Sequence, residues 1–297
     1  MTIACVGITV LDRVFRIPYL PESGGKFVAT DYFEIGGGPA ATAAVAVKKL
    51  NHSVQFIGRV GDDSVAATML AEFNEYGVGC NNIIQIANAS SAFSAVLVDD
   101  QGERMIINYQ DKSLSRDITP LNNVDFSTFS TILCDVRWTE GAQYALEQAR
   151  LHNIPSVLDA DITPDSIDDL VLLADHIAFS EVGLANFTGT SSLEEGLRIA
   201  ATKTKGRVYV TVGSKGCYWL ESGTIKHQAG VLVDVVDTTG AGDVFHGAFA
   251  VAVAEKMDTR EAVIFSNNVA ALKCTKLGGR DGIPTREVVN EYISSHQ

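Results

Sequence analysis

Short apolar runs alternate with amphipathic stretches along most of this chain. The first run, residues 2–10, ends close to Asp12, which predicts a buried parallel strand with a polar residue at its C-terminal end. Similar runs predict further strands at residues 54–58, 131–136, 156–159, 176–179 and 208–212. Helical patterns separate most of these runs. Alternating strands and helices are typical of βαβ units, so the pattern predicts an α/β fold with a mostly parallel central sheet and helices on both faces.

Helical periodicity is clearest near the first strands and at the end of the chain. The predicted helices cover residues 40–50, 64–76, 241–255, 260–275 and 286–294. The first of these is rich in alanine and follows Pro39. The second is followed by Gly77, a suitable residue for a helix C-cap.

Two segments have strand character but do not fit the βαβ pattern. Residues 14–33 contain prolines and glycines and predict an irregular hairpin, and residues 92–99 and 104–108 predict a second, well-alternating hairpin. We therefore expect a single domain over residues 1–297, with insertions near 13–33 and 92–108 that pair into a small antiparallel β-lid. Such a lid would cover the crevice at the strand ends, where open α/β sheets bind ligands.

The composition narrows the possible partners. The net charge is −13, and an acidic chain repels nucleic acid and anionic membranes, so we expect neither as a partner. An anionic small molecule would need a local cluster of cationic side chains and backbone N–H groups. No apolar run is long enough to span a membrane. The 5 cysteines are scattered and lack a CxxC pair, which argues against disulfides and structural zinc and favours the cytoplasm.

The most informative stretch is the glycine-rich segment at residues 235–247. It predicts a strand that ends at Val236, a turn through Gly240 and Gly242, and then an apolar helix. The free N–H groups and the dipole at the start of such a helix favour a bound phosphate. Asp243 lies in the first helical turn, where accepting a proton from an attacking hydroxyl would explain a carboxylate beside that phosphate. Alternatively, Asp243 only complements the helix dipole. A dinucleotide-binding motif fits less well, because a third glycine is missing at the required spacing.

Three motifs together resemble the ribokinase-like (PfkB) family of sugar kinases. Residues 237–243 read Asp-Thr-Thr-Gly-Ala-Gly-Asp, residues 36–43 read Gly-Gly-Gly-Pro-Ala-Ala-Thr-Ala, and residues 56–63 read Phe-Ile-Gly-Arg-Val-Gly-Asp-Asp. The match extends over nearly the whole chain. It implies a ribokinase-like fold, ATP-dependent phosphorylation of a sugar with Mg²⁺, and a lid that often forms the contact of a homodimer.

The resemblance also implies roles for individual residues. Asp243 corresponds to the catalytic base, and the anion hole corresponds to the backbone of Gly240, Ala241 and Gly242. The implied sugar-binding residues are Asp12, Gly37 and Gly38. Asp12 has a simpler alternative role as a cap at the end of a strand.

The remaining implied positions concern the nucleotide and the metals. The nucleotide-binding residues would be Thr211, Gly213, Gly216 and Asn267. Asp237 and Thr239 correspond to part of a site for a monovalent cation such as K⁺, although hydrogen bonding within the loop explains them equally well. The family usually carries Asn-x-x-Glu near its Mg²⁺, whereas this chain has Ser180-Glu181-Val182-Gly183. Glu181 is therefore the candidate protein contact for Mg²⁺.

Three further residues bear on the identity of the sugar. Lys26 lies in the first lid segment, Asn108 ends the second lid hairpin, and Arg137 follows a strand. In the family's architecture they would converge at the end of the sugar remote from Asp243, where they suit a phosphate or a sulfonate. Residues 4–10, 36–44, 135–138, 159–164 and 271–275 resemble the sulfofructose kinase branch of the family. That branch phosphorylates 6-deoxy-6-sulfofructose at its 1-hydroxyl during sulfoquinovose breakdown.

Other functions on the same fold stay open at this point. They include kinases for fructose 6-phosphate, tagatose 6-phosphate or nucleosides. A sugar sensor that kept the fold is the non-enzyme alternative, and only the altered residues 180–183 favour it. The intact turn at residues 240–243 favours an enzyme, because a sensor needs no catalytic base.

Overall fold

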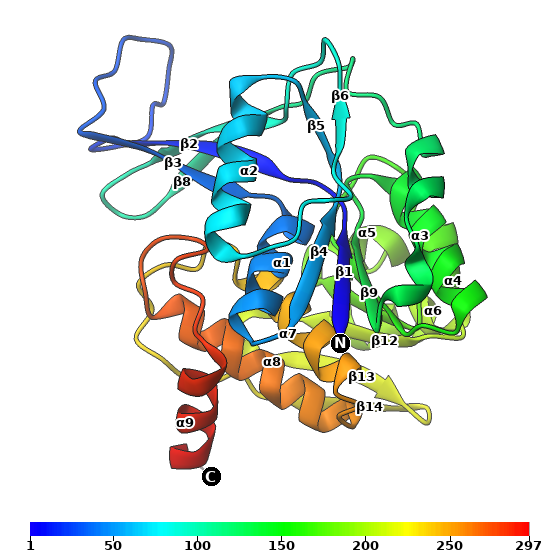
Figure 1. Cartoon of the computed structure of the whole chain (residues 1–297). Coiled ribbons are helices and arrows are strands. Elements are labelled where there is room, and N and C mark those ends of the chain that lie inside the picture. The colour runs from blue at the N-terminus through cyan, green and yellow to red at the C-terminus, as the bar shows by residue number, and fades with distance from the viewer. Residues whose placement is uncertain (297) are drawn as a thin grey trace.

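A mostly parallel sheet forms the centre of the molecule (Figure 1), a computed structural model that describes residues 1–296. Within these residues the sheet has eight strands in the order β14-β13-β12-β11-β10-β9-β1-β4. Its parallel strands are β1 (Thr2–Val6), β4 (Ser53–Ile57), β9 (Thr131–Asp135), β10 (Ser156–Ala160), β11 (His176–Ser180) and β12 (Arg207–Thr211). An antiparallel hairpin, β13 (Cys217–Glu221) and β14 (Thr224–Gln228), extends one edge. The predicted α/β class and the predicted parallel strands are confirmed.

Helices cover both faces of this sheet. One face is covered by α1 (Pro39–Lys49), α7 (Ala241–Ala254), α8 (Thr259–Cys274) and α9 (Arg286–His296). The other face is covered by α3 (Thr139–His152), α4 (Asp168–Leu173), α5 (Glu181–Thr188) and α6 (Leu193–Thr202). Because successive residues of a strand point to opposite faces, Ile3 and Cys5 of β1 join the first core and Ala4 and Val6 join the second.

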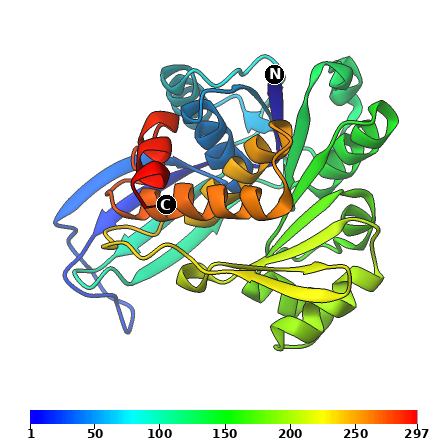
Figure 2. The same cartoon turned by 90° about the horizontal axis from the view of Figure 1, so that it is seen from below.

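A separate four-stranded sheet forms the lid, which projects from one side of the molecule (Figure 2). Its strands, in spatial order, are β3 (Asp31–Gly37), β2 (Val10–Arg16), β7 (Phe93–Val98) and β8 (Arg104–Tyr109). The two predicted hairpins are therefore present and paired. Within each hairpin the two strands are antiparallel, whereas β2 of the first hairpin and β7 of the second are parallel neighbours. Helix α2 (Ser64–Tyr76) and the short strands β5 (Arg59–Gly61) and β6 (Ile84–Ile86) connect the lid to the main body.

Two sequence-based expectations about strands are wrong. Residues 2–10 are not one strand, because β1 ends at Val6 and the chain then enters the lid as β2, so Asp12 lies inside a lid strand. The segment before the glycine-rich turn is not a strand either. The chain leaves the sheet edge after β14, and Val235 and Val236 are 62% and 58% exposed. No helix among residues 1–296 is long and apolar enough to cross a membrane.

Candidate active site

The glycine-rich turn leads directly into α7. Gly240 adopts a left-handed conformation with φ of 73°, and the helix begins at Ala241. The N–H of Ala241 donates to the carbonyl of Thr238 at 3.2 Å. Within residues 1–296, the N–H groups of Gly242 and Asp243 have no backbone partner, and a Cβ on Gly242 would meet no atom within 4 Å. Unpaired N–H groups in open space at a helix N-terminus form a site for an anion.

Asp243 lies in the first turn of α7 among other carboxylates. Burial raises the pKa of Asp243 to about 7, and the negative charge of Asp159 adds to this shift, whereas His246 opposes it. Asp135 and Asp161 contribute in the same direction as Asp159. A carboxylate with a pKa near neutrality is well suited to accept a proton in the reaction. The candidate base of the sequence analysis therefore has electrostatic surroundings that fit this role.

The neighbours of Asp243 come from the carboxyl ends of two adjacent strands. Asp135 of β9 and Asp159 of β10 are paired in register, so both side chains point to the face covered by α7. Asp135 accepts hydrogen bonds from the N–H groups of Ile8, Ala40 and Arg137. The sequence analysis did not identify this acidic cluster, because Asp135 and Asp159 look like ordinary strand-end residues until the strand order is known.

His246 is the only imidazole that contacts this cluster within residues 1–296. Its Nδ1 atom lies 2.9 Å from Oδ2 of Asp159, and the two side chains are 4% and 6% exposed. Burial alone lowers the pKa of His246, but the charge and hydrogen bond of Asp159, together with the charges of Asp243 and Asp161, outweigh this, and the net shift is upward. His246 is three residues from Asp243 on the same helix, which places both on one side of α7. A positive charge on His246 therefore favours the ionised form of Asp243.

A cavity of about 400 Å³ lies between the lid and the carboxyl ends of the strands. It is lined by the predicted residues Asp12, Gly38, Asn108 and Arg137. Asp12, Ser94 and Asn108 are paired in register across β2, β7 and β8, so their side chains share one face of the lid. Gly37 lies beside Asp12, because a Cβ on Gly37 would collide with the carboxylate of Asp12. The structure thus brings most of the predicted sugar-binding residues together.

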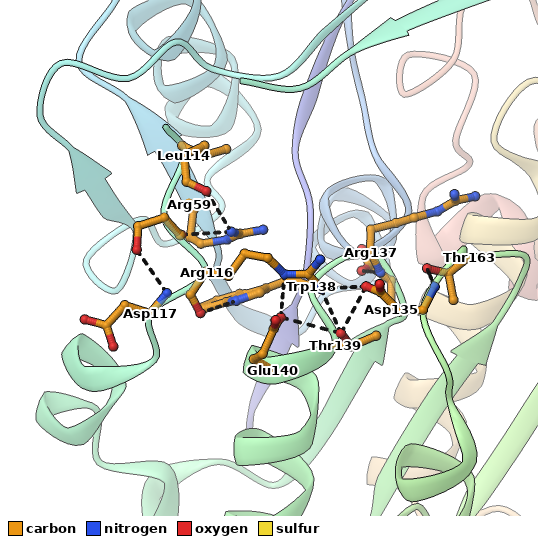
Figure 3. A network of polar contacts seen from close by, with 12 residues as sticks. Arg59, Leu114, Arg116, Asp117, Asp135, Arg137, Trp138, Thr139, Glu140 and Thr163 are labelled. Carbon is orange, nitrogen blue, oxygen red and sulfur yellow. Dashed lines mark hydrogen bonds and ion pairs between the residues drawn. The ribbon is translucent and has the colours of Figure 1, made fainter. Parts of the chain in front are cut away.

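Two arginines line this cavity, and they differ in their partners (Figure 3). Arg116 is held by Glu140 at 2.7 Å and by Asp165 at 2.6 Å, so two carboxylates neutralise its charge. The guanidinium of Arg137 extends away from that network, and its single partner in residues 1–296 is Asp161 at 3.2 Å. Arg137 is 37% exposed, so it remains available to an anion in the cavity.

Lys26 does not line this cavity. Residues 17–30 connect β2 to β3 at the outer end of the lid, whereas Asp12 is near the inner end of β2. Lys26 is exposed in this connection. The expectation that Lys26, Asn108 and Arg137 converge is therefore wrong for Lys26, because the hairpin is long enough to carry its loop away from the strand ends.

A second cavity, of about 350 Å³, is bordered by the glycine-rich turn. It is lined by the predicted residues Thr211, Gly213, Gly216 and Asn267, together with Ala241 and Gly242 of the turn. Gly216 has a φ of 92°, and a Cβ there would collide with the carbonyl of Gln228. The wall also contains Val231, Val233 and Phe245, which suit a flat apolar base. The glycine turn thus borders this second cavity through Thr238, Ala241 and Gly242.

Asp237 lies just before the turn and carries a dense set of contacts. Its carboxylate accepts hydrogen bonds from Arg104 at 2.9 Å and from the N–H of Gly278 at 3.1 Å. Thr239 donates to it through both its N–H and its hydroxyl group. Nζ of Lys273 lies 3.6 Å from the carboxylate. Burial raises the pKa of Asp237, but these hydrogen bonds and cations outweigh that effect and lower the pKa to about 2.

The comparison with known proteins agrees with this geometry. The model of the pfkB family of carbohydrate kinases matches residues 2–286. The chain belongs to this family. A ribokinase from Haemophilus influenzae is 27% identical over 98% of each chain. The structure of an Agrobacterium tumefaciens protein, provisionally named a ribokinase, is 37% identical, with a TM-score of 0.92 and coverage of 99% and 98%. Arabidopsis thaliana ribokinase, solved with ribose and ATP, is 25% identical, with a TM-score of 0.86 and coverage of 98% and 97%.

Family membership makes this protein a phosphotransferase that acts on a sugar hydroxyl. Its ribokinase-like fold is confirmed by the solved structures. The relatives also include a deoxyribokinase and a fructokinase, so the family name does not define which sugar is used. The chemistry of the cavity under the lid must therefore guide the choice of substrate.

The two metals implied by the PfkB resemblance differ in how well the site fits them. Mg²⁺ needs few protein ligands, because phosphate and water oxygens complete its shell, and the acidic end of the sheet offers carboxylates. Glu181 is exposed at the first position of α5 and lines neither cavity. For K⁺ the fit is poor, because Lys273 and Arg104 already neutralise Asp237. A K⁺ ion about 4 Å from the charged group of Lys273 or Arg104 would be repelled by about 4 kcal/mol at an effective dielectric constant of about 20.

Proposed function

We propose that this PfkB kinase transfers the γ-phosphoryl group of ATP to the 1-hydroxyl of 6-deoxy-6-sulfofructose. The observation that carries this proposal is that Arg137 and Asn108 line the same cavity as Asp12. Asp12 is a hydrogen-bond acceptor for sugar hydroxyls, and Arg137 and Asn108 are donors for an anionic group at the opposite end of the sugar.

The transfer itself is assigned to the glycine turn and Asp243. Asp243 accepts the proton of the attacking hydroxyl, for which a pKa of about 7 is well suited. Of the anion hole expected at Gly240, Ala241 and Gly242, the N–H of Ala241 is held by Thr238, so the N–H groups of Gly242 and Asp243 receive the phosphoryl oxygens. Mg²⁺, when bound with ATP, would supply further positive charge to the phosphates, with the carboxylates at the acidic end of the sheet as its candidate protein contacts. The cavity lined by Thr211, Gly213, Gly216 and Asn267 holds the nucleotide.

The charge balance of the cavity favours a sulfonate over a phosphate. Arg116 is neutralised by two carboxylates, so Arg137 is the principal cation left for a ligand. A sulfonate carries one negative charge, whereas a phosphate ester carries nearly two at neutral pH. Fructose 6-phosphate and tagatose 6-phosphate are therefore the second candidates, because their extra charge would need a further cation.

We propose that a homodimer forms through the lid. The outer strand β8 exposes apolar side chains, with Ile106 at 55% and Ile107 at 61% exposure, and Phe27 and Val28 are exposed in the outer loop. Apolar patches of this kind mark association surfaces.

Sedimentation analysis tests the dimer. Ile107→Lys is expected to convert a lid-mediated dimer into a monomer, because it places a charge in the apolar contact. Val182→Lys is the matched control, since Val182 is an exposed apolar residue on α5, away from the lid. A dimer that survives Ile107→Lys unchanged would count against a lid contact.

Product analysis tests the reaction. The purified protein is incubated with ATP, Mg²⁺ and 6-deoxy-6-sulfofructose, and the product is examined by mass spectrometry and by ³¹P–¹³C coupling. We expect one added phosphoryl group, attached to the oxygen on C1. A phosphoryl group at another position, or ATP hydrolysis without a phosphorylated sugar, would refute the proposed reaction.

A further inference from the structure

The oxygens of Asp237 already face groups of the protein. One carboxylate oxygen accepts from Arg104 and twice from Thr239. The other accepts from the N–H of Gly278, and Nζ of Lys273 lies 3.6 Å from it. The backbone carbonyl of Asp237 accepts from Nζ of Lys273 at 2.9 Å. A metal ion at Asp237 would therefore compete with two cationic side chains for the same oxygens.

Lys273 is the most unusual of these partners. Its side chain is 0% exposed, and it lies in the last turn of α8. A buried ammonium group is costly unless it is paired, and here both the carbonyl and the carboxylate of Asp237 face it. The negative end of the α8 dipole stabilises a cation at the same place. The ammonium group of Lys273 therefore lies where oxygen atoms of Asp237 and a helix terminus converge.

The last turn of α8 also fixes the backbone that leads into the active-site turn. The carbonyl of Cys274 accepts hydrogen bonds from the N–H groups of Val236 and Asp237. Asp237 in turn binds the N–H and the hydroxyl group of Thr239. Gly240 follows immediately. Lys273 is therefore linked through Asp237 and Thr239 to the turn that receives the phosphoryl group.

Arg104 and Lys273 contact Asp237 from different parts of the molecule. Arg104 belongs to lid strand β8 and is 32% exposed, so any displacement of the lid would move it away from Asp237. Lys273 belongs to α8 in the main body, and its side chain is fully buried. The contact of Lys273 with Asp237 is therefore the one that does not depend on the lid.

We propose that the ammonium group of Lys273 takes the place of the monovalent cation at Asp237 and Thr239, so that this kinase works without K⁺ or NH₄⁺. Lys273 is a positioning residue, since it acts on the anion hole through Asp237 and Thr239. The inference rests on the proposed function, because it assumes that the glycine turn receives the phosphoryl group.

The first experiment compares salts on the unmodified protein. Turnover and thermal melting are measured in KCl and in tetramethylammonium chloride at equal ionic strength, the second cation being too large for a site between protein oxygens. We expect turnover to agree within about twofold and K⁺ to leave the melting temperature unchanged, because a ligand that does not bind the folded state does not stabilise it. A several-fold activation by K⁺, or a higher melting temperature in KCl, would overturn the proposal.

The second experiment removes the ammonium group. Lys273→Ala leaves a space beside the oxygens of Asp237, so its turnover should fall by about tenfold or more in tetramethylammonium chloride and recover several-fold in KCl or NH₄Cl. Lys276→Ala is the matched control, because Lys276 is an exposed lysine three residues further along the chain. A folded Lys273→Ala protein that responds equally to all salts would refute the role of Lys273.

The two readouts separate this inference from the proposed function. If Lys273→Ala does not fold, the salt comparison on the unmodified protein still decides. If the protein phosphorylates no sugar, the proposed function fails. The melting temperature in K⁺ then still reports whether the cation binds beside Lys273.

Discussion

The two ends of the parallel sheet carry opposite charges. At the carboxyl end, Asp135, Asp159, Asp161 and Asp243 influence one another electrostatically, and His246 is their imidazole partner. At the amino end, a groove of about 490 Å³ is lined by Arg150, Lys205, Arg207 and Lys256, with Asp175 as its acidic residue. Both ends are concave and polar, but the reasons for their charges differ.

The amino-end cations have a structural explanation. Helices α3, α4, α6 and α7 end there, and cations near helix C-termini stabilise the helix dipoles. Arg150, for example, donates to the carbonyls of Leu172 and Leu173 at the end of α4. The acids at the carboxyl end repel one another, and the pKa of Asp243 is raised rather than lowered. A charge that costs stability in this way is typical of a functional site. The comparison therefore locates the chemistry at the acidic end.

The largest effect is expected from removing the base at the acidic end. Asp243→Asn should reduce turnover by about 10²- to 10⁴-fold, because the amide cannot accept the proton of the sugar hydroxyl. Binding of ATP and sugar, measured by calorimetry, should stay close to that of the unmodified protein. Turnover within a few-fold of the unmodified protein would show that Asp243 is not the catalytic base.

A smaller effect is expected at the anionic end of the sugar cavity. Arg137→Ala should raise the KM for 6-deoxy-6-sulfofructose by about 10- to 100-fold, since a hydrogen bond between charged groups is lost. The KM for plain fructose should change much less, because fructose offers no anion to Arg137. Steady-state kinetics with both sugars gives the ratio. Equal changes for the two sugars would show that Arg137 does not contact the sulfonate.

The pH dependence of turnover reports on the acidic cluster as a whole. With the pKa of Asp243 at about 7, the carboxylate that accepts the proton is lost as the pH falls through neutrality. We therefore expect turnover to fall about tenfold between pH 8 and pH 6, in proportion to the ionised fraction of Asp243. The rate is measured at saturating ATP and sugar across that range. A flat profile would mean that the neighbouring carboxylates do not set the ionisation of the base.

The smallest effect is expected at the amino end. Lys205→Ala should leave turnover unchanged and lower the free energy of unfolding by less than about 1 kcal/mol, since an exposed cation near a helix end contributes little. Urea denaturation and the kinase assay measure the two quantities. A large loss of turnover in Lys205→Ala would contradict the assignment of a purely structural role to this end.

Much of the fold follows from local pattern. The parallel strands of the main sheet from β4 to β12, the helix at residues 64–76 with Gly77 as its cap, and the second lid hairpin are predicted close to their observed bounds. The errors occur where the pattern does not say which sheet a strand joins. Asp12 follows an apolar run that the structure divides between two sheets, and Val236 continues an apolar pattern after the chain has left the sheet edge.

The candidate site divides in a similar way. Residues within a motif, such as Gly240 and Asp243, are recognisable because their spacing carries the chemistry. The partners that set their electrostatics lie far away in the sequence. His246 meets Asp159 and Lys273 meets Asp237 only after the strands and helices have packed, so no local pattern marks these pairs. Lys26 illustrates the converse, since its place in a lid segment did not reveal that the loop points outward.

Direct competition between sugars tests the central claim most directly. Equal concentrations of 6-deoxy-6-sulfofructose, fructose 6-phosphate, fructose and ribose are mixed with limiting ATP·Mg²⁺, and the phosphorylated products are quantified by mass spectrometry. The product ratio gives the relative kcat/KM values. We predict that phosphorylated 6-deoxy-6-sulfofructose predominates, because Arg137, which has one carboxylate partner where Arg116 has two, matches the single charge of the sulfonate. Predominant phosphorylation of ribose, fructose or fructose 6-phosphate would contradict the account.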